Sequence, residues 1–379
     1  MATPTLTMIP SAYKAEKVYS VLPTNGDGDL FFDRNTPATR VNKDGLIEQV
    51  GTDVPTLDYS DGSCPSLLLE RYSLNLALYS EDFTNTFWAT GGTIRTSGFL
   101  SPSGELNACL VKDGGNNYMA SYGMSLISSR TYTLSVYLKA KTPTTITLKL
   151  QELGGDYTNY FGSEITLTNE WVRYEVTGQK GTDGNPARIV FEYISDSEEF
   201  FIAFSQLEEQ PYATSYIPTT SETASRSGDS FSKTGLSSYI SSTAGVLYAE
   251  IASLSTGDNT TRVFSLNDGG GTNIVYIGFS SSGGRIYAGI NYQIVAYFTP
   301  TDPTDFYKVA IKYEDNNTKF FVNGNQIGST ETTQTVPSGL SQIKSTSGLN
   351  SDRFYGKVKD LRVYNTLLTD LELKELTTI

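Results

Sequence analysis

The most constraining feature of the sequence is a two-residue alternation of apolar and polar side chains. The stretch TYTLSVYLKAK, residues 131–141, puts every second residue on one apolar face: Tyr132, Leu134, Val136, Leu138 and Ala140. This period fits a strand with one buried face and does not fit a helix. Similar stretches follow, namely TTITLKLQEL, EWVRYEVTG, ARIVFEYIS and EFFIAFSQLE. Short strands at about ten-residue spacing predict an antiparallel β-sandwich over residues 77–222.

A second set of strand-like stretches fills residues 236–379, among them GVLYAEIA, NIVYIGFS, GRIYAGIN and FYKVAIKYE. The sequence FFVNGNQIG predicts a hairpin, because Asn-Gly favours a two-residue turn, here Asn323-Gly324. LLTDLELKEL predicts one short C-terminal helix, with Thr369 and Glu372 forming a capping box. Leu368 and Leu373 occupy the hydrophobic-staple positions of that helix.

The first 76 residues are turn-rich, with Asn-Gly and Asp-Gly pairs in PTNGDGDLFFD, VNKDGLIE and YSDGSCPS. Their few apolar residues are too little core for a separate domain. The Ser/Thr-rich stretch 216–235 predicts a linker, set at 223–235. We therefore predict an all-β chain: an N-terminal irregular anchoring region (1–76), two antiparallel β-sandwich (jelly-roll) domains (77–222 and 236–379) and one short C-terminal helix.

Composition narrows the functions that remain. The chain has no histidine, which removes His-dependent catalysis and His metal ligands. The acidic clusters DSEEF (196–200), LEEQ (207–210) and YEDNN (313–317) lack the paired carboxylates of a glycosidase. We therefore predict that the chain is not an enzyme.

A net charge of −13 disfavours nucleic acid and anionic membranes as partners. No apolar run reaches the ~20 residues of a membrane helix. The first residues have no signal-peptide pattern, so synthesis in a cytoplasm is expected. Cys64 and Cys109 indicate no disulfide framework.

The C-terminal block resembles concanavalin A-like, laminin-G-type lectin sandwiches. Its last strand and helix match that family at Gly356, Val358, Asp360, Leu361, Arg362, Val363, Tyr364 and Asn365, and its hairpin matches at Phe321, Val322, Asn323, Gly324 and Gly328. These motif residues form turns, core and caps, so the resemblance implies the fold and leaves the ligand open.

The middle block resembles jelly-roll carbohydrate-binding modules, through NLALYSEDFTNTFW, YTLSVYLKAK, EWVRYEVTG and QLEEQPYATSYIPT. Trp171 corresponds to a packing position of that family, and Trp88 is interpreted equally well as core or as ligand-binding. The aromatic stretch GGDYTNYFG offers surface candidates. The predicted glycan-binding residues are Tyr157, Tyr160, Phe161 and Trp88, although the stretch fits a subunit contact equally. No cofactor is expected. A structural Ca²⁺ is compatible with both families, and no ligand residues for it are identified.

Residues 8–220 as a whole resemble a recurrent module of tailed-bacteriophage virion proteins, found in tail fibres and head fibres. The resemblance rests on the N-terminal block, on NLALYSEDF and on QLEE with ATSYIPT. It implies a virion location and other virion proteins as partners. The absence of a coiled-coil or β-helix pattern favours a compact head fibre or decoration protein.

The N-terminal hairpin TPATRVNKDGLIEQVG, residues 36–51, has too few apolar residues to bury itself. Other chains would supply the missing burial, so we predict that this hairpin attaches the chain to the virion and to further copies of itself. Analogy with the phage family implies that these copies form a trimer. The residues assigned to this role are Arg40, Val41, Asn42, Asp44, Gly45, Leu46 and Ile47.

The predicted function is adhesion of a virion to surface glycans through its β-sandwich domains. The alternatives are a tail-fibre or tail-tip receptor-binding protein, a purely structural spacer without a glycan ligand, and a glycan-cleaving depolymerase.

Overall fold

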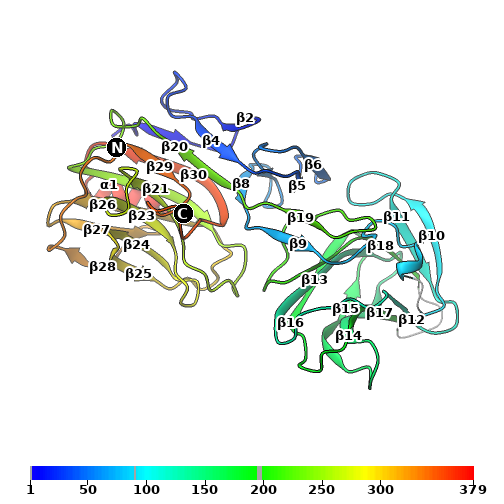
Figure 1. Cartoon of the computed structure of the whole chain (residues 1–379). Coiled ribbons are helices and arrows are strands. Elements are labelled where there is room, and N and C mark those ends of the chain that lie inside the picture. The colour runs from blue at the N-terminus through cyan, green and yellow to red at the C-terminus, as the bar shows by residue number, and fades with distance from the viewer. Residues whose placement is uncertain (1, 89–90, 194–198) are drawn as a thin grey trace. The chain divides into compact units, whose positions relative to one another are not determined.

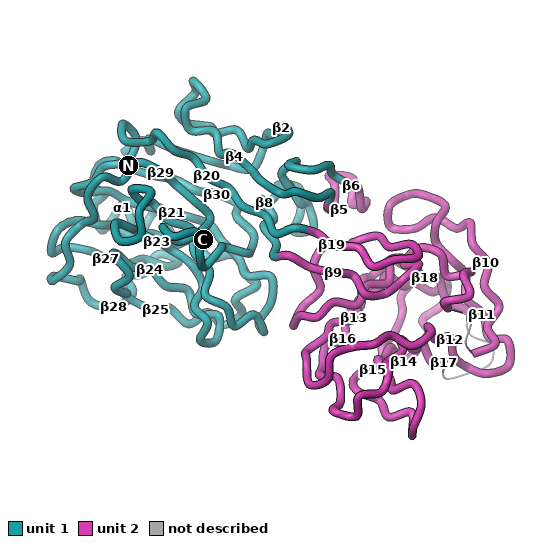
Figure 2. The backbone as a smooth tube through the Cα atoms, in the orientation of Figure 1, with its two compact units in different colours: residues 1–37, 50–71, 227–379 teal, residues 38–49, 72–226 magenta. Residues whose placement is uncertain are grey.

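The computed structural model of the chain describes residues 2–88, 91–193 and 199–379. The chain divides into two compact units (Figure 2). Unit 1 combines residues 1–37, 50–71 and 227–379, and unit 2 combines residues 38–49 and 72–226. Both units are built from antiparallel strands, which confirms the all-β prediction (Figure 1).

Unit 1 contains two sheets that enclose one apolar core. The first runs in the order β28 (Asn325–Glu331), β27 (Thr318–Val322), β26 (Tyr307–Glu314), β21 (Ala244–Ala252), β30 (Gly356–Tyr364), β8 (Ser66–Leu69) and β7 (Leu57–Asp58), with β1 (Leu6–Met8) also paired to β30. The second runs in the order β2 (Tyr13–Lys14), β3 (Lys17–Val18), β4 (Leu30–Asp33), β20 (Ser230–Lys233), β29 (Gln342–Lys344), β22 (Arg262–Asn267), β23 (Ile274–Phe279), β24 (Ile286–Ile290) and β25 (Gln293–Phe298).

The C-terminal prediction is confirmed in detail. Helix α1 (Asp370–Thr377) begins after Thr369, and Thr369 and Glu372 form a complete capping box. Leu368 and Leu373 are both buried in one apolar cluster with residues of β21 and β30. The Asn323-Gly324 turn joins β27 to β28, and both turn residues have positive φ, as a type I′ turn requires.

Unit 2 is a sandwich of a five-stranded and a four-stranded sheet. The first is β10 (Ile94–Phe99), β11 (Ala108–Lys112), β18 (Glu199–Glu208), β13 (Thr131–Lys139) and β16 (Val172–Gln179); the second is β12 (Tyr118–Ala120), β17 (Ala187–Tyr193), β14 (Thr144–Glu152) and β15 (Asn159–Leu167). Two small pairs complete the unit, β9 (Ser73–Asn75) with β19 (Ala224–Arg226) and β5 (Ala38–Val41) with β6 (Ile47–Val50), together with the 3₁₀ turn η1 (Thr86–Trp88).

Residues 1–76 do not form a body of their own. Strands β1, β4, β7 and β8 are members of the two sheets of unit 1, and Leu6, Met8, Leu30 and Phe32 are fully buried in its core. The apolar residues of this block therefore find their partners within the chain. The expectation that other chains must supply this burial is wrong, because pairing over more than 200 residues of sequence supplies it.

The stretch 223–235 is not a free linker either. Strand β20 pairs with both β4 and β29, and Phe231 is 2% exposed in the core of unit 1. Pairing on both sides of β20 and one inward-facing Phe outweigh the Ser/Thr-rich composition of this stretch.

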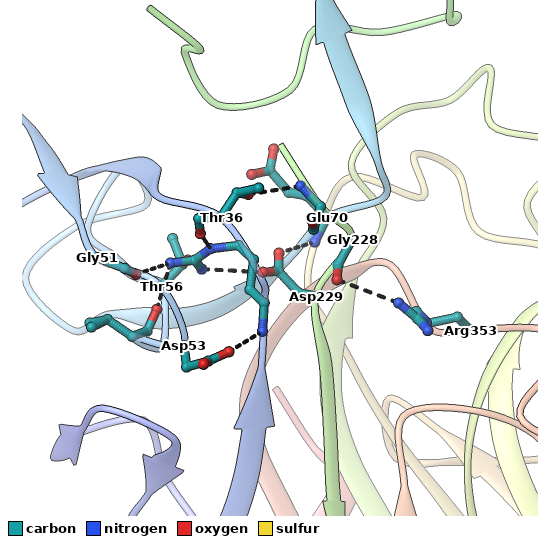
Figure 3. A network of polar contacts seen from close by, with 11 residues as sticks. Thr36, Gly51, Asp53, Thr56, Glu70, Gly228, Asp229 and Arg353 are labelled. Atoms are coloured by element: carbon teal, nitrogen blue, oxygen red, sulfur yellow. Dashed lines mark hydrogen bonds and ion pairs between the residues drawn. The ribbon is translucent and has the colours of Figure 1, made fainter. Parts of the chain in front are cut away.

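A polar network in unit 1 joins three of its discontinuous segments (Figure 3). The fully buried Arg34 donates to the carbonyls of Thr36, Gly51 and Val54 and to the hydroxyl of Thr56, and forms an ion pair with the fully buried Asp229 at 3.2 Å. Asp229 also accepts a hydrogen bond of 2.7 Å from the amide of Glu70. One guanidinium thereby fixes the path of residues 34–36, 51–56 and 229.

Candidate functional site

The outer face of the four-stranded sheet in unit 2 holds the best-defined candidate for ligand binding. Along β14, Ile146, Leu148 and Leu150 point into the core, so Gln151 and Lys149 lie on the opposite face. The strand register places Gln151 between Asn159 of β15 and Arg188 of β17. We call Tyr118, Gln151, Tyr157, Asn159 and Arg188 the sheet platform.

The polar side chains of the sheet platform form a connected chain. Arg188 donates to Oε1 of Gln151 through Nε at 3.0 Å and through Nη2 at 2.7 Å. The amide nitrogen of Gln151 donates in turn to Oδ1 of Asn159 at 2.9 Å. Because each partner orients the next, the planar guanidinium is held in a fixed position and keeps donors available for a ligand.

Two tyrosines flank that guanidinium. The Arg188 guanidinium carbon lies 4.9 Å from the centroid of the Tyr157 ring and 5.5 Å from that of Tyr118. Tyr157 follows the end of β14 and is 50% exposed, so its ring is available at the surface. An accessible aromatic ring beside oriented donors is what recognition of a sugar requires, since the ring packs on C–H groups and the donors bind hydroxyls.

The other two residues of the predicted aromatic stretch are placed differently. Tyr160 and Phe161 lie on β15 and pack partly against the core of unit 2. The Tyr160 hydroxyl donates to Asp183 at 2.7 Å, which lowers the pKa of that carboxyl to about 2. Burial and the Asp183 charge raise the pKa of Tyr160. Tyr160 and Phe161 are therefore committed to contacts within the unit.

The prediction that Trp88 stacks on a glycan does not agree with its position in the structure. It ends η1, is 0% exposed, and contacts Phe83, Phe87 and Phe191 with ring centroids 5.0–6.2 Å apart. Its indole N–H donates to the Tyr79 carbonyl at 3.0 Å. With its faces covered and its only donor bonded, the ring has no surface to offer a ligand.

Trp171 is partly exposed, and the Lys139 ammonium lies 4.9 Å from its ring centroid. Its N–H donates to the Leu100 carbonyl at 3.2 Å. It lies beside an apolar cluster on the five-stranded sheet, in agreement with a packing role.

The predicted attachment residues lie in the β5–β6 hairpin. Ile47 is buried against Ala108, Ala203, Phe204 and Tyr216 of unit 2. The turn is organised by Asn42, whose side-chain oxygen accepts from the amides of Asp44 and Leu46, and Gly45 has φ +77°.

The remaining hairpin side chains differ in exposure. Arg40 forms an ion pair with Glu48 at 2.7 Å, and Val41 is half-buried. Asp44, Gly45 and Leu46 form the exposed tip. The hairpin thus packs on its own unit through Ile47, and its tip is exposed.

The carboxylate clusters show no catalytic arrangement among the residues that the structure describes. Glu208 is buried and accepts from the amide of Thr214 at 3.0 Å and from the Gln210 side chain. Glu314 and Asp315 accept hydrogen bonds that hold a turn and a nearby loop. Most of DSEEF lies outside the described residues. Within those residues no group of three or more His, Cys, Asp or Glu side chains could hold a metal ion, and no helix is long and apolar enough to cross a membrane.

Sequence reasoning missed Arg188, Gln151 and Tyr118. Arg188 and Gln151 each occupy an outward position in a strand of alternating apolar and polar residues. This pattern marks them as surface residues, but it does not show which strands are neighbours. Only the register of β14 with β17 brings them together.

Comparison with known protein families agrees with the division of the chain into two β-sandwich units. Residues 226–374 match the model of the concanavalin A-like lectin/glucanases superfamily, and residues 77–197 match that of a carbohydrate binding domain. No curated protein matches the chain.

Solved structures with similar parts include a protein described as "CBM4 structure and function" (22% identity, 27% of this chain and 72% of that one, TM-score 0.25). A sialyllactose-bound CBM40 of a Ruminococcus gnavus sialidase covers 36% of this chain and 84% of its own (16% identity, TM-score 0.29). A xylan-binding CBM22 domain from Paenibacillus barcinonensis covers 38% and 99% (12% identity, TM-score 0.30). The two family matches and the observed sheets together show a carbohydrate-binding-module-like sandwich and a concanavalin A-like lectin sandwich in this chain.

Proposed function

We propose that the chain is a bacteriophage virion structural protein, a head fibre or decoration protein, which displays glycan-binding sandwiches for adhesion. The observation that carries the adhesive role is the sheet platform of unit 2, with Arg188 held between Tyr118 and the exposed Tyr157. The virion role is supported by the resemblance of residues 8–220 to phage appendage modules. The tail-fibre role is a variant of the same proposal with another place on the particle.

On this proposal the Tyr157 ring packs against one face of a sugar while Arg188 and Asn159 bind its hydroxyls. An open site with one accessible ring gives weak affinity for a single sugar. Several copies on one particle raise the effective concentration and turn weak contacts into firm adhesion.

The proposal is tested by glycan-array binding of the full chain and of two variants. Tyr157→Ala and Arg188→Ala should each lower binding about tenfold, because each removes a contact of the platform. Tyr72→Ala is the matched control, since Tyr72 is 58% exposed in the same unit and is not part of the platform. Adhesion through this site is refuted if no glycan binds, or if the platform variants behave like the control; the spacer role then remains.

Attachment to the particle is proposed to use the exposed hairpin tip around Asp44, Gly45 and Leu46. Leu46→Asp should reduce incorporation into particles while leaving the unfolding temperature of unit 2 unchanged, because Leu46 is 39% exposed. Purified particles and free protein are compared by immunoblot, and the solution mass reports whether the chain is a trimer. Full incorporation of the variant would place the attachment surface elsewhere.

A further inference from the structure

Unit 1 contains a pocket of about 240 Å³ on the outer face of the sheet formed by β22, β23, β24 and β25. Its lining includes Tyr276, Tyr287, Tyr292 and Tyr297, and we call it the tyrosine pocket. We propose that the tyrosine pocket binds a single neutral pyranose ring. This site belongs to unit 1 and does not depend on the sheet platform of unit 2.

The strand register explains why the tyrosine rings lie together here. Across the sheet, one outer row runs Val263, Gly278, Tyr287, Tyr297, and the next runs Ser265, Tyr276, Gly289, Ile294. Each row contains one glycine beside a tyrosine, and the two glycines are staggered by one strand. The absence of a side chain at Gly289 lets the Tyr276 ring lie over its cross-strand partner, and this ring and the neighbouring tyrosines border the pocket.

Gly289 is needed for the position of one ring. A Cβ atom at residue 289 would lie 2.2 Å from the hydroxyl oxygen of Tyr276, so any other residue would displace that ring. Gly278 is similarly constrained, because a Cβ there would lie 2.0 Å from the Arg262 carbonyl oxygen.

The rings are packed on one another and only partly covered. Ring centroids of Tyr276 and Tyr287 are 5.5 Å apart, and Tyr287 and Tyr297 are stacked at 5.8 Å. Tyr276 and Tyr287 are 4% and 6% exposed, whereas Tyr292 and Tyr297 are 45% and 40% exposed. Two rings therefore form the floor and two stand at the rim.

The hydroxyls of Tyr276 and Tyr287 make no hydrogen bond within the described ranges of the chain, and neither oxygen is among the fully buried unpartnered atoms, so both are accessible to a ligand in the pocket. Burial raises the pKa of both groups, so both remain neutral donors at physiological pH. Two unpaired hydroxyls in an apolar pocket match a ligand that carries hydroxyls of its own.

Tyr292 gives an independent indication. Asn291 and Tyr292 form the two-residue turn between β24 and β25, with φ of +50° and +63°. Glycine is preferred at the second position of such a turn, and a bulky side chain is strained there. Strained residues concentrate at binding sites, where the side chain is retained at a cost in stability.

Charge selects the class of sugar. Among the described residues that line the tyrosine pocket, Asp352 is the one acidic or basic residue, and it is exposed. It accepts hydrogen bonds from ligand hydroxyls and repels sialic or uronic acids. Arg285 lies 4.2 Å from the Tyr297 ring but does not line the pocket. The volume is below the about 300–1,000 Å³ of sites for drug-sized ligands, which suits one ring rather than a chain.

The experiment is ligand-observed NMR on the full chain with methyl glycosides of glucose, galactose and N-acetylglucosamine, and with N-acetylneuraminic acid. A neutral glycoside should bind, and Tyr276→Phe should weaken that binding about fivefold through loss of one hydroxyl. Tyr292→Gly should weaken it about tenfold and, at the same time, raise the unfolding temperature of unit 1 by about 2–4 °C.

Asn316→Gly is the matched control for Tyr292→Gly. Asn316 also has positive φ, +56°, at a turn of unit 1 that does not line the pocket, so its replacement should leave binding unchanged. The inference is overturned if none of the neutral glycosides binds, if N-acetylneuraminic acid is preferred, or if Tyr276→Phe and Tyr292→Gly bind like the parent. Because Tyr157→Ala alters only the sheet platform, loss of binding in that variant alone would concern the proposed function and not this pocket.

Discussion

Arg34→Ala should destabilise unit 1 selectively. The Arg34 guanidinium makes at least five polar contacts within unit 1, and its ion pair with Asp229 joins two side chains that are both 0% exposed. Truncation to Ala removes the cation from this buried ion pair, which costs about 3–5 kcal/mol in comparable pairs. That is a large part of the about 5–15 kcal/mol by which domains are stable.

The two tryptophans make the prediction easy to measure. Trp88 and Trp171 both belong to unit 2, so tryptophan fluorescence reports the unfolding of that unit alone. In Arg34→Ala the unfolding followed by far-UV circular dichroism should gain an earlier transition, about 10 °C below that of the parent. The fluorescence transition should stay where it is.

The control is Lys17→Ala, which removes a partly exposed ion pair to Asp29 at 3.2 Å in the same unit. Exposed pairs contribute under about 1 kcal/mol, so its unfolding temperature should shift by less than about 3 °C. The reasoning fails if Arg34→Ala behaves like this control. It fails equally if the fluorescence transition moves by the same amount, since the units would then unfold as one.

Three further outcomes are expected. Ile47→Ala should lower the stability of unit 2 by about 2 kcal/mol, seen by tryptophan fluorescence, with no change in solution mass; a change in mass alone would restore a role for Ile47 between chains. Thr369→Ala should cost unit 1 about 1 kcal/mol by removing the N-cap of α1, measured by circular dichroism, whereas an unchanged midpoint would show that the cap contributes nothing. At pH 8 one thiol of the native chain should react with Ellman's reagent, because Cys64 is exposed while burial raises the pKa of Cys109 to about 11, and two reactive thiols would contradict this. Between pH 9 and 11 the Cys109 thiol loses its proton in the unfolded chain before it does in the folded chain, so the stability of unit 2 should fall as the pH rises through this range.

Alternation and capping predicted the long strands and the helix because both are local. The strand at 131–139 and the capping box at Thr369 follow from spacings within a few residues. Strands β2, β3 and β7 have two residues each and leave no period to detect. Their pairing is set by contacts far along the chain, which no local pattern contains.

The candidate site was predictable to the same limited extent. Tyr157 was found because a loop aromatic is visible in the sequence. Trp88 was misassigned because the sequence does not tell that Phe83, Phe87 and Phe191 surround it. The tyrosine pocket depends on which glycine faces which tyrosine across strands, and that register appears only in the folded chain.

The insertion of unit 2 into unit 1 has a consequence for how the chain is made. Residues 72–226 and the preceding hairpin are complete once residue 226 has been synthesised, whereas β1 must wait for its partner β30, with Leu6 opposite Val363. At about 5–20 residues per second, that wait lasts roughly 20–70 s. During translation β1 and β8 therefore lack β30, the strand that pairs with both of them, and the interval most sensitive to aggregation lasts until β30 leaves the ribosome.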